Sequence, residues 1–330
     1  MTTPTQGPAA PPPRAGAAVA ALVAVQILFG VHYGVAKEIM EVIPAAAWAL
    51  VRCVGAATIL ALLVVVTRRR WPRSLADWSI LAVLSVFGVT LNQILFIEGL
   101  YRSTTLHSVV VMASIPLQTL LFSALLRQER LTVAKLSGVV VGGIGIAYLL
   151  FGQAESRADD VATTTAAQPF WDSIAGGDLL MTLNAGSFSL FLALSKRPAR
   201  TMDPLVMTAV CFAIGAIPIV FYGYSSFVAV TWSDVPIATY GFATFAILGA
   251  TVGTYLLNFY ALKRVSASLV GIFVYLQFII AGIVGVTWRQ ESFSWRLVVA
   301  GILVISGLQL RLLHRDRIAR TAQAEAERAS

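Results

Sequence analysis

The chain has few charged residues. Only 12% of its 330 residues are Asp, Glu, Lys or Arg, which is about half of what a soluble domain carries. Hydrophobic residues make up 58%, and the mean hydropathy is +0.80. These values exclude a soluble core with a polar shell and indicate a polytopic integral membrane protein.

Cysteine, histidine and nucleotide-binding motifs are equally scarce. The two cysteines, Cys53 and Cys211, lie inside apolar segments, which argues against a disulfide framework. The three histidines are scattered and lack metal-ligand spacing. No G-x-x-x-x-G-K-[ST] loop occurs, so ATP cannot drive the chain directly. We expect neither a cofactor nor a metal.

Signatures of membrane-embedded enzymes are also missing. The stretch 175–178, Ala-Gly-Gly-Asp, narrowly departs from the Gly-x-Gly-Asp of intramembrane aspartyl proteases, and no second membrane aspartate follows. Ile305-Ser306-Gly307 lacks a glycine that a rhomboid-type serine motif needs. We therefore expect no enzymatic activity.

What the chain does have is a series of ten apolar runs. Each reaches about 20 residues, the length that a helix needs to cross the hydrocarbon layer. We predict an all-α membrane protein with ten transmembrane helices at 17–38, 44–66, 78–101, 105–126, 132–152, 174–197, 204–224, 235–262, 266–288 and 294–313. A cleaved signal peptide is the alternative for the first run, but that run is too long and contains His32 and Lys37.

One break between the runs is longer than the others and acidic, and it separates five runs from five. The predicted organisation is a disordered cytoplasmic tail at 1–16, a five-helix repeat at 17–152, an extracytoplasmic linker at 153–173, a second repeat at 174–313 and a cytoplasmic tail at 314–330. Because five is odd, the two repeats must enter the membrane in opposite orientations.

The basic residues predict which loops are cytoplasmic. With the N-terminus inside, eighteen Lys and Arg residues fall in inner segments and five in outer ones, while Arg52 lies within a span. Cytoplasmic loops carry the excess of Lys and Arg. We expect both termini to be cytoplasmic in a multi-pass protein of the cytoplasmic (inner) membrane. The net charge of +8 is therefore a topology signal, and we expect no nucleic-acid partner.

A short sequence motif that occurs twice supports the internal repeat. The triplet Arg-Gln-Glu at 127–129 returns at 289–291, 162 positions later, in a polar break between apolar runs. Pro44 and Pro204 each open the second span of their half. Membrane proteins built from two related halves usually hold a shared central site. The two triplets themselves are expected on opposite sides of the membrane, as matched turns between the fourth and fifth spans.

The chain resembles the EamA-like members of the drug/metabolite transporter superfamily over about 17–313. The residues that carry the resemblance are Phe29-Gly30, Lys37, Pro44, Arg52, Gly99-Leu100, Thr104-Thr105, Pro116, the run 127–132, Gly138 and the glycines between 142 and 145. The chain departs from the family signature at Gln128, where Gly is usual, and at Ser292, where Arg would stand.

This resemblance implies two inverted five-helix repeats, alternating access and transport of small metabolites, usually export. It also implies that spans one, three and four of each half line a central path. Polar residues of those spans are the candidates for a substrate path: His32, Tyr33, Asn92, Gln93, Glu98, Ser114, Gln118, Asn184, Ser187, Tyr255, Asn258, Tyr275 and Gln277. The alternative is that these amides and hydroxyls only hold helices together, at about 0.6 kcal/mol per contact.

Three charged residues, Lys37, Arg52 and Arg102, are candidates for the rim of the path or for coupling. Glu98 and Arg102 share a helix face, so Glu98 could bind a substrate amine, take up a proton or form a rim salt bridge. Arg52 is costly inside a membrane and needs a partner. That partner could be a substrate carboxylate, or one of Glu38, Glu41 and Glu98.

Two histidines and one proline complete the predictions. His32 is a candidate for proton coupling because histidine titrates near neutral pH, and a structural histidine is the alternative. We interpret His107 as a rim residue. Pro116 should kink the fourth span, because proline removes a helical hydrogen bond.

The sequence favours a secondary active transporter for small metabolites, with amino acids as one candidate class, working by alternating access. A multidrug exporter or an importer of the same fold is the runner-up, and a membrane-embedded enzyme or scaffold ranks below. The predicted partners are a small-molecule substrate and membrane lipid, with a proton as a candidate coupling ion. Substrate identity, direction and oligomeric state do not follow from the sequence.

Overall fold

The computed structural model describes residues 13–128, 133, 136–145, 147–148, 170–195, 198–262, 267–291, 295–296, 298–303 and 305–306. These residues form helices and their connections, without a strand among them.

The first half of the chain contributes four long helical segments, two of which are interrupted. Its elements are α1 (Pro13–Val42), α2 (Ala45–Val66), α3 (Leu75–Ser85), the π-helix η1 (Val86–Thr90), α4 (Leu91–Arg102), α5 (Thr105–Met112) and α6 (Ile115–Leu125). The second half contributes η2 (Phe170–Asp172), α8 (Ile174–Ser195), α9 (Pro198–Thr201), α10 (Pro204–Ala229), η3 (Trp232–Asp234), α11 (Ile237–Thr244), the π-helix η4 (Phe245–Gly253), α12 (Thr254–Leu262) and α13 (Ala267–Thr287).

Seven helices in the described part of the chain are long and apolar enough to cross a membrane. They are Gly16–Val42, Ala45–Val66, Leu75–Arg102, Thr105–Leu125, Ile174–Ser195, Pro204–Ala229 and Ile237–Asn258. Two shorter apolar helices, Leu136–Gly145 and Leu276–Thr287, lie within further predicted spans. The prediction of a multi-pass, all-helical membrane protein is confirmed. The number ten remains a prediction, because the structure describes the expected spans 132–152 and 294–313 only in part.

The first helix is longer than predicted. We expected it to end near residue 38, but α1 continues to Val42. Lys37 and Glu38 are tolerated inside the helix because both side chains have polar partners at this end of the bundle: Lys37 donates to the carbonyl of Ser103, and Glu38 pairs with Arg289.

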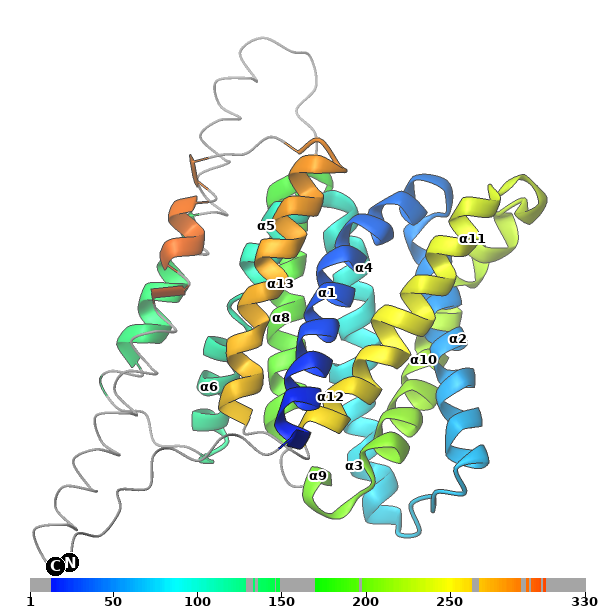
Figure 1. Cartoon of the computed structure of the whole chain (residues 1–330). Helices are drawn as coiled ribbons and strands as arrows, with labels where there is room; N and C mark the ends of the chain where they lie inside the picture. Colours follow the sequence, from blue (N-terminus) through cyan, green and yellow to red (C-terminus); the bar gives the residue numbers. More distant parts are fainter. Residues whose placement is uncertain are drawn as a thin grey trace, which may run out of the picture.

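Helices of the two halves pack against each other in matched pairs (Figure 1). α2 packs on α10, which are the second spans of their halves. α1 packs on α12 and α13, and α8 correspondingly packs on α4 and on α5 and α6. The first span of each half thus contacts the third and fourth spans of the other half, which places α1 and α8 at the centre of the bundle.

Both halves carry a π-helical segment at the same place in the repeat. η1 and η4 interrupt the third span of their respective halves. Moved by the repeat distance of 162 residues, Val86–Thr90 falls on positions 248–252, inside η4. Insertions of this kind are rare and often lie at functional sites. This structural match is a second indication of an internal repeat, independent of the Arg-Gln-Glu triplets.

The fourth span breaks at the predicted proline. α5 ends at Met112 and α6 begins at Ile115, with Pro116 in the first turn of α6. Proline fits this position because its missing N–H would have no helical partner there. The helix is thus interrupted next to Pro116, and a bend at this point stays a prediction.

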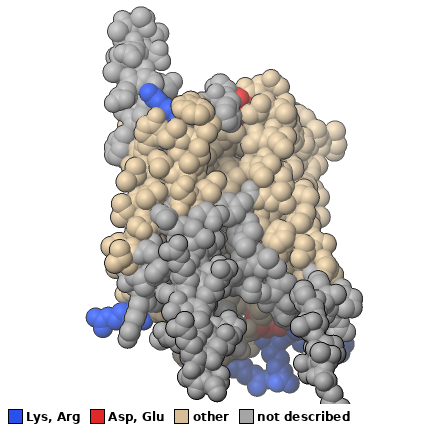
Figure 2. Space-filling view, turned by 60° about the vertical axis from the view of Figure 1, so that its left-hand side comes forward, with Lys and Arg blue, Asp and Glu red and all other residues tan. Residues whose placement is uncertain are grey.

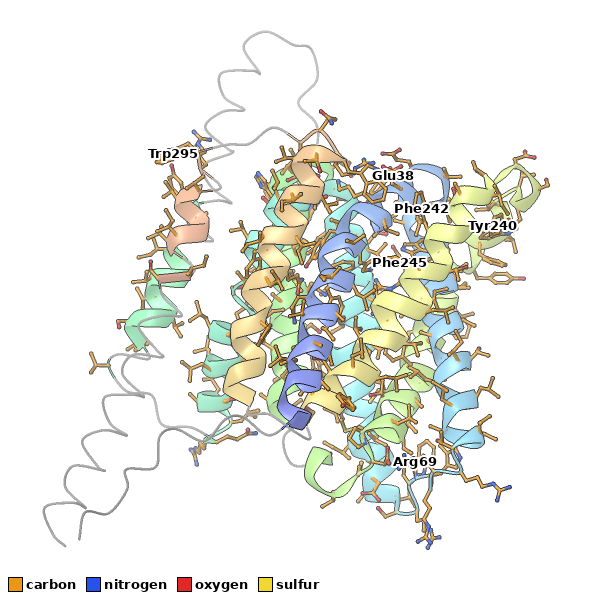
Figure 3. All side chains as sticks on the ribbon, in the orientation of Figure 1. Glu38, Arg69, Tyr240, Phe242, Phe245 and Trp295 are labelled. Carbon is orange, nitrogen blue, oxygen red and sulfur yellow. The ribbon has the colours of Figure 1, made fainter. Side chains whose placement is uncertain are left out.

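The two ends of the bundle differ in charge. Arg68, Arg69, Arg70 and Arg73 lie at one end, which we call the basic end. Figure 3 places Arg69 at this lower end and Glu38 at the opposite, upper end. On the face seen in Figure 2, blue basic side chains gather at the lower end and the described wall between the ends is tan. This distribution is expected where lipid surrounds the wall.

Close helix contacts depend on glycine at two places where the halves meet. A Cβ at Gly177 of α8 would lie 2.5 Å from the backbone nitrogen of Ser103. A Cβ at Gly223 of α10 would clash with the backbone carbonyl of Ala46. Small residues are characteristic of such contacts, since dispersion forces between closely packed backbones hold membrane helices together.

Candidate functional site

A cluster of aromatic and polar side chains lies buried among α1, α2 and α4. The ring of Phe96 is at its centre. His32 stacks on this ring with centroids 5.9 Å apart, and Tyr33 meets it edge-on at 5.7 Å. The guanidinium carbon of Arg52 lies 5.6 Å from the ring centroid. We call His32, Tyr33, Arg52 and Phe96 the central cluster.

Arg52 is buried in this cluster with its hydrogen-bonding capacity incompletely used. The side chain is 5% exposed. Its Nε donates to the hydroxyl of Thr251 in η4, at 3.2 Å, and that hydroxyl in turn donates to the carbonyl of Ala246. Its Nη1 is buried without a partner. A buried, unpaired polar atom costs about 1–3 kcal/mol.

The carboxylates that could have neutralised Arg52 are engaged elsewhere. Glu38 and Glu41 both pair with Arg289, and Glu98 pairs with Arg102. None of them forms an ion pair with Arg52 within the described part of the chain. Of the partners considered from the sequence, only a substrate carboxylate remains.

Other polar atoms near the middle of the bundle also lack partners. Both ring nitrogens of His32 are buried without a hydrogen bond, and the side chain is 1% exposed. Oε1 of Gln93, one turn before Phe96 on α4, and Oε1 of Gln26 on α1 are also buried without a partner. Polar groups inside a membrane usually face a cavity or one another. These atoms are therefore candidates to contact a ligand, although buried atoms without a partner also occur elsewhere, as at Trp48 and Thr119.

The second half contacts the cluster through Gln277, and two further predicted residues, Tyr255 and Asn258, lie on α12. Gln277 of α13 donates to the hydroxyl of Tyr33 at 3.4 Å. Tyr255 of α12 meets Phe212 edge-on at 5.7 Å, and Asn258 lies half-buried one turn further along α12. A void of about 10 Å³ beside Tyr255 could hold roughly one water molecule. The side chain of Tyr275 lies outside the described residues.

A second set of predicted residues forms hydrogen bonds that hold helices together, mostly to backbone carbonyl groups, although Oδ1 of Asn184 has no partner. Asn184 donates to the carbonyl of Asn92 at 2.5 Å, and Ser187 to that of Phe87 at 2.7 Å. Ser114 donates to the carbonyl of Val111 and accepts from Gln118 at 2.8 Å. For these residues the structure favours the alternative in which polar groups hold α8, α4 and the fourth span together. The side chain of Asn92 itself is half-buried.

The end opposite the basic end is closed by polar contacts between the halves. Glu98 pairs with Arg102 and accepts a hydrogen bond from Tyr222 of α10. Arg102 also approaches Asp172 at 3.8 Å. The predicted Glu98–Arg102 pair is confirmed, and Tyr222 is a partner that the sequence did not indicate.

A buried Asp–His pair lies in the same layer. Asp178 of α8 is fully buried, and its carboxylate contacts Nδ1 of His107 at 2.7 Å. The same carboxylate accepts from the hydroxyl of Ser103, whose carbonyl accepts from Lys37. The interpretation of His107 as a rim residue was wrong: the residue is 9% exposed, because its ring turns inward to Asp178.

Glu291 and Arg289, from the second Arg-Gln-Glu triplet, complete this layer. The carboxylate of Glu291 accepts from the backbone N–H groups of Thr105 at 2.7 Å and Leu106 at 2.9 Å, which cap the start of α5. Partial burial lowers the pKa of the Arg289 guanidinium, but hydrogen bonds to Glu41 and Glu38 outweigh this and raise the pKa above its usual value. We call Lys37, Glu98, Arg102, His107, Asp178, Arg289 and Glu291 the closing layer.

Sequence reasoning missed Asp178 and gave Glu291 no specific role. A signal existed for Asp178, because a carboxylate within an apolar span is rare and usually functional. For Glu291 the signal was its recurrence in the repeated triplet, but its partners at 105 and 106 are nearly 190 positions away in the chain.

The basic end is less tightly joined. A hollow of about 540 Å³ opens there, and its lining includes Arg68, Arg73, Thr201 and Met202. One exposed ion pair, Arg69 to Asp203 at 3.0 Å, crosses between the halves at its edge. Exposed pairs of this kind contribute at most about 1 kcal/mol.

Comparison with known proteins agrees with this architecture. The profile of the EamA-like transporter family matches twice, at residues 16–151 and 175–312. An uncharacterised transporter of Bacillus subtilis, YyaM, is 23% identical over 241 residues, covering 72% of this chain and 74% of its own. An uncharacterised transporter of Archaeoglobus fulgidus is 22% identical over 284 residues, covering 86% and 94%.

More distant likenesses point the same way. A chloroplastic WAT1-related protein of Arabidopsis thaliana is 23% identical over 281 residues, covering 82% of this chain and 63% of its own. One solved crystal structure superposes with a TM-score of 0.59 at 19% identity, over 92% of this chain and 98% of that one, which shows a shared fold. The chain therefore belongs to the EamA-like transporter family, within the drug/metabolite transporter superfamily.

Proposed function

We propose that this protein is a secondary active transporter that moves small metabolites, with amino acids as one candidate class, across the cytoplasmic membrane by alternating access, in the direction of export. The observation that carries the proposal is the asymmetry between the two ends. The closing layer joins the halves through the buried or half-buried pairs His107–Asp178 and Glu38–Arg289, whereas the described part of the basic end has one exposed ion pair beside a hollow.

Alternating access requires two halves that rock against each other around a fixed site. The matched helix pairs and the paired π-helices support two inverted five-helix repeats with the central cluster between them. In this proposal the basic end and both termini are cytoplasmic, as the positive-inside rule predicts. The structure then corresponds to a state that is closed on the outside.

A role in coupling belongs to the carboxylates of the closing layer. Glu98 contacts the hydroxyl of Tyr222 on α10 and Arg102 of its own helix, and Asp178 contacts the hydroxyl of Ser103 and His107 of α5. Protonation of either carboxylate would weaken those contacts, and would thus favour opening of the layer. A proton gradient is accordingly the proposed driving force, with exchange as the alternative.

The test is uptake and efflux of labelled amino acids and other metabolites in proteoliposomes, with and without a pH gradient. We expect flux that depends on the protein and is reduced in Glu98→Gln. Absence of flux for every compound, together with unchanged behaviour of Glu98→Gln and Asn92→Ala, would contradict the site assignment. Flux that does not depend on the pH gradient would indicate a facilitator or an importer instead of a proton-driven exporter.

A further inference from the structure

We propose that Arg52 binds a carboxylate group of the substrate, so that the transported class consists of small organic carboxylates. This inference rests on the proposed transport function and makes it more specific. It starts from a contradiction in the structure: a guanidinium is 5% exposed in the middle of a membrane protein, yet no carboxylate of the described residues pairs with it.

The cost of this arrangement is large enough to need an explanation. A charged side chain at the centre of a span is costly and usually has a function. Arg52 cannot escape by reaching lipid headgroups, because Nε is held by Thr251 at 3.2 Å and the guanidinium lies over Phe96. The contact with Phe96 is a cation–π interaction, which offsets only part of this cost.

The free hydrogen-bond donor defines where a ligand would contact the arginine. Thr251 occupies Nε, while Nη1 is buried and has no partner. A carboxylate oxygen at Nη1 would supply the missing acceptor and the missing negative charge together. Such charge-assisted bonds to guanidinium are short and about twice as strong as neutral ones.

The surroundings favour one negative charge over two. Two other described side chains, His32 and Tyr33, contact the ring of Phe96 beside Arg52, and neither carries a permanent positive charge. A phosphate dianion would therefore be only half neutralised. The orphaned nitrogens of His32 and Oε1 of Gln93 provide further polar contacts for the rest of a small ligand. The stacked aromatic rings suit an apolar portion.

Arg52 also connects the candidate site to the moving parts. Thr251 belongs to η4, in the second half of the chain, and Arg52 to α2 in the first. A ligand at Nη1 would thus act on a residue that already bridges the halves near a π-helix. Neutralising the charge at this bridge would lower the electrostatic cost of the packed state.

The experiment compares matched carboxylates and amides on the purified full-length protein in detergent. The probes are 4-methylpentanoate with 4-methylpentanamide, phenylacetate with phenylacetamide, L-leucine with L-leucinamide, and inorganic phosphate. The readout is the midpoint of thermal unfolding, followed by equilibrium binding of each compound that shifts it. We expect at least one carboxylate to raise the midpoint by several degrees. Its amide should bind at least about tenfold more weakly, and phosphate should have no effect.

Variants of Arg52 separate binding from structure. Arg52→Gln should abolish the carboxylate effect and raise the midpoint of the ligand-free protein, because a buried, unpaired charge is removed. Arg52→Lys keeps the charge but loses the planar fork, and should weaken carboxylate binding at least tenfold while remaining folded. Arg70→Gln, which removes an exposed arginine at the basic end, is the matched control and should leave binding unchanged.

Several results would overturn the proposal: no carboxylate binds, the amide or phosphate binds as well as the carboxylate, Arg52→Lys binds normally, or Arg52→Gln lowers the ligand-free midpoint. The last is the behaviour of a structural arginine.

Failure of the proposed transport function can be distinguished from failure of the carboxylate site. Arg52-dependent carboxylate binding without any flux would contradict the transport function alone, whereas flux of amines that is unaffected in Arg52→Lys would contradict the carboxylate site alone.

Discussion

The carboxylate of Glu291 accepts a hydrogen bond from the backbone N–H of Thr105 at 2.7 Å, across 186 positions of the chain. Glu291 follows α13 in the second half, and Thr105 begins α5 in the first. A helix start leaves backbone N–H groups unsatisfied and carries a partial positive charge, so an anion there is stabilising. The repeated triplet therefore has a physical role in its second copy: it joins the two halves at the closing layer.

Removal of this cap should destabilise the protein. We expect Glu291→Ala to lower the free energy of unfolding by about 0.5–2 kcal/mol, the range found for lost helix caps. Thermal unfolding in detergent micelles measures the effect. Gln290→Asn is the control, because Gln290 has a φ of 53° and Asn tolerates this left-handed conformation. Equal midpoints for Glu291→Ala and the control would show that the cap contributes nothing.

Glycine at 177 should be irreplaceable. A Cβ there would meet three backbone atoms at 2.5–2.9 Å, from Gly99, Arg102 and Ser103, and backbone cannot move aside as a side chain can. Gly177→Ala should cost at least about 1–3 kcal/mol, as overpacking does. The same substitution at Gly241, which has nothing within 4 Å of its Cβ position, is the matched control. Unfolding midpoints that agree for the two variants would refute the close contact between α8 and the α4–α5 turn.

The Asp178–His107 contact should appear as a coupling energy. We expect a double-mutant cycle with Asp178→Asn and His107→Gln to give about 0.5–3 kcal/mol, the range for residues in direct contact. The free energies of unfolding of the wild type, both single variants and the double variant provide the measurement. Pairing Asp178→Asn with Arg70→Gln, at the other end of the bundle, should give no coupling. Strict additivity in the first cycle would exclude the pair.

The predicted orientation has its own test. A reporter fused after residue 330 should be cytoplasmic, and a reporter inserted after residue 160 should be on the opposite side, because five spans separate the predicted tail from the linker. Alkaline phosphatase and a fluorescent protein, each active on one side only, report the location. Finding both positions on the same side of the membrane would break the five-plus-five arrangement.

The sequence was sufficient for the class of the fold because apolar runs, loop charges and Pro116 act locally. It also predicted the Glu98–Arg102 pair, since residues four apart share a helix face. The sequence did not predict contacts between residues that are far apart in the chain. His107 and Asp178 are 71 positions apart, and neither residue by itself indicates that the other covers it. The environment of Arg52 could not be predicted for the same reason, because it depends on the pairing of Glu38, Glu41 and Glu98 with other arginines.

Polar residues of the predicted lining spans fell into two groups that the sequence could not separate. Ser187 and Ser114 bond to helix backbones, whereas His32, Arg52 and Gln93 retain unpaired atoms. Asn184 combines the two, because its amide nitrogen donates to a backbone carbonyl while its Oδ1 is unpaired. The difference depends on the rotation of each helix and on the positions of neighbouring carbonyl groups. Only the packed structure fixes these quantities.

The most direct test of alternating access is the side from which the middle of the bundle can be reached. In a Cys53→Ala, Cys211→Ala background, Gln93→Cys places one thiol beside the central cluster, and a membrane-impermeant maleimide is applied to right-side-out and inside-out vesicles. We predict labelling from the side of the basic end. Adding Arg289→Gln and Glu291→Gln, which weaken the closing layer, should transfer labelling to the opposite side. Equal labelling from both sides, or none from either side in both backgrounds, would contradict the account.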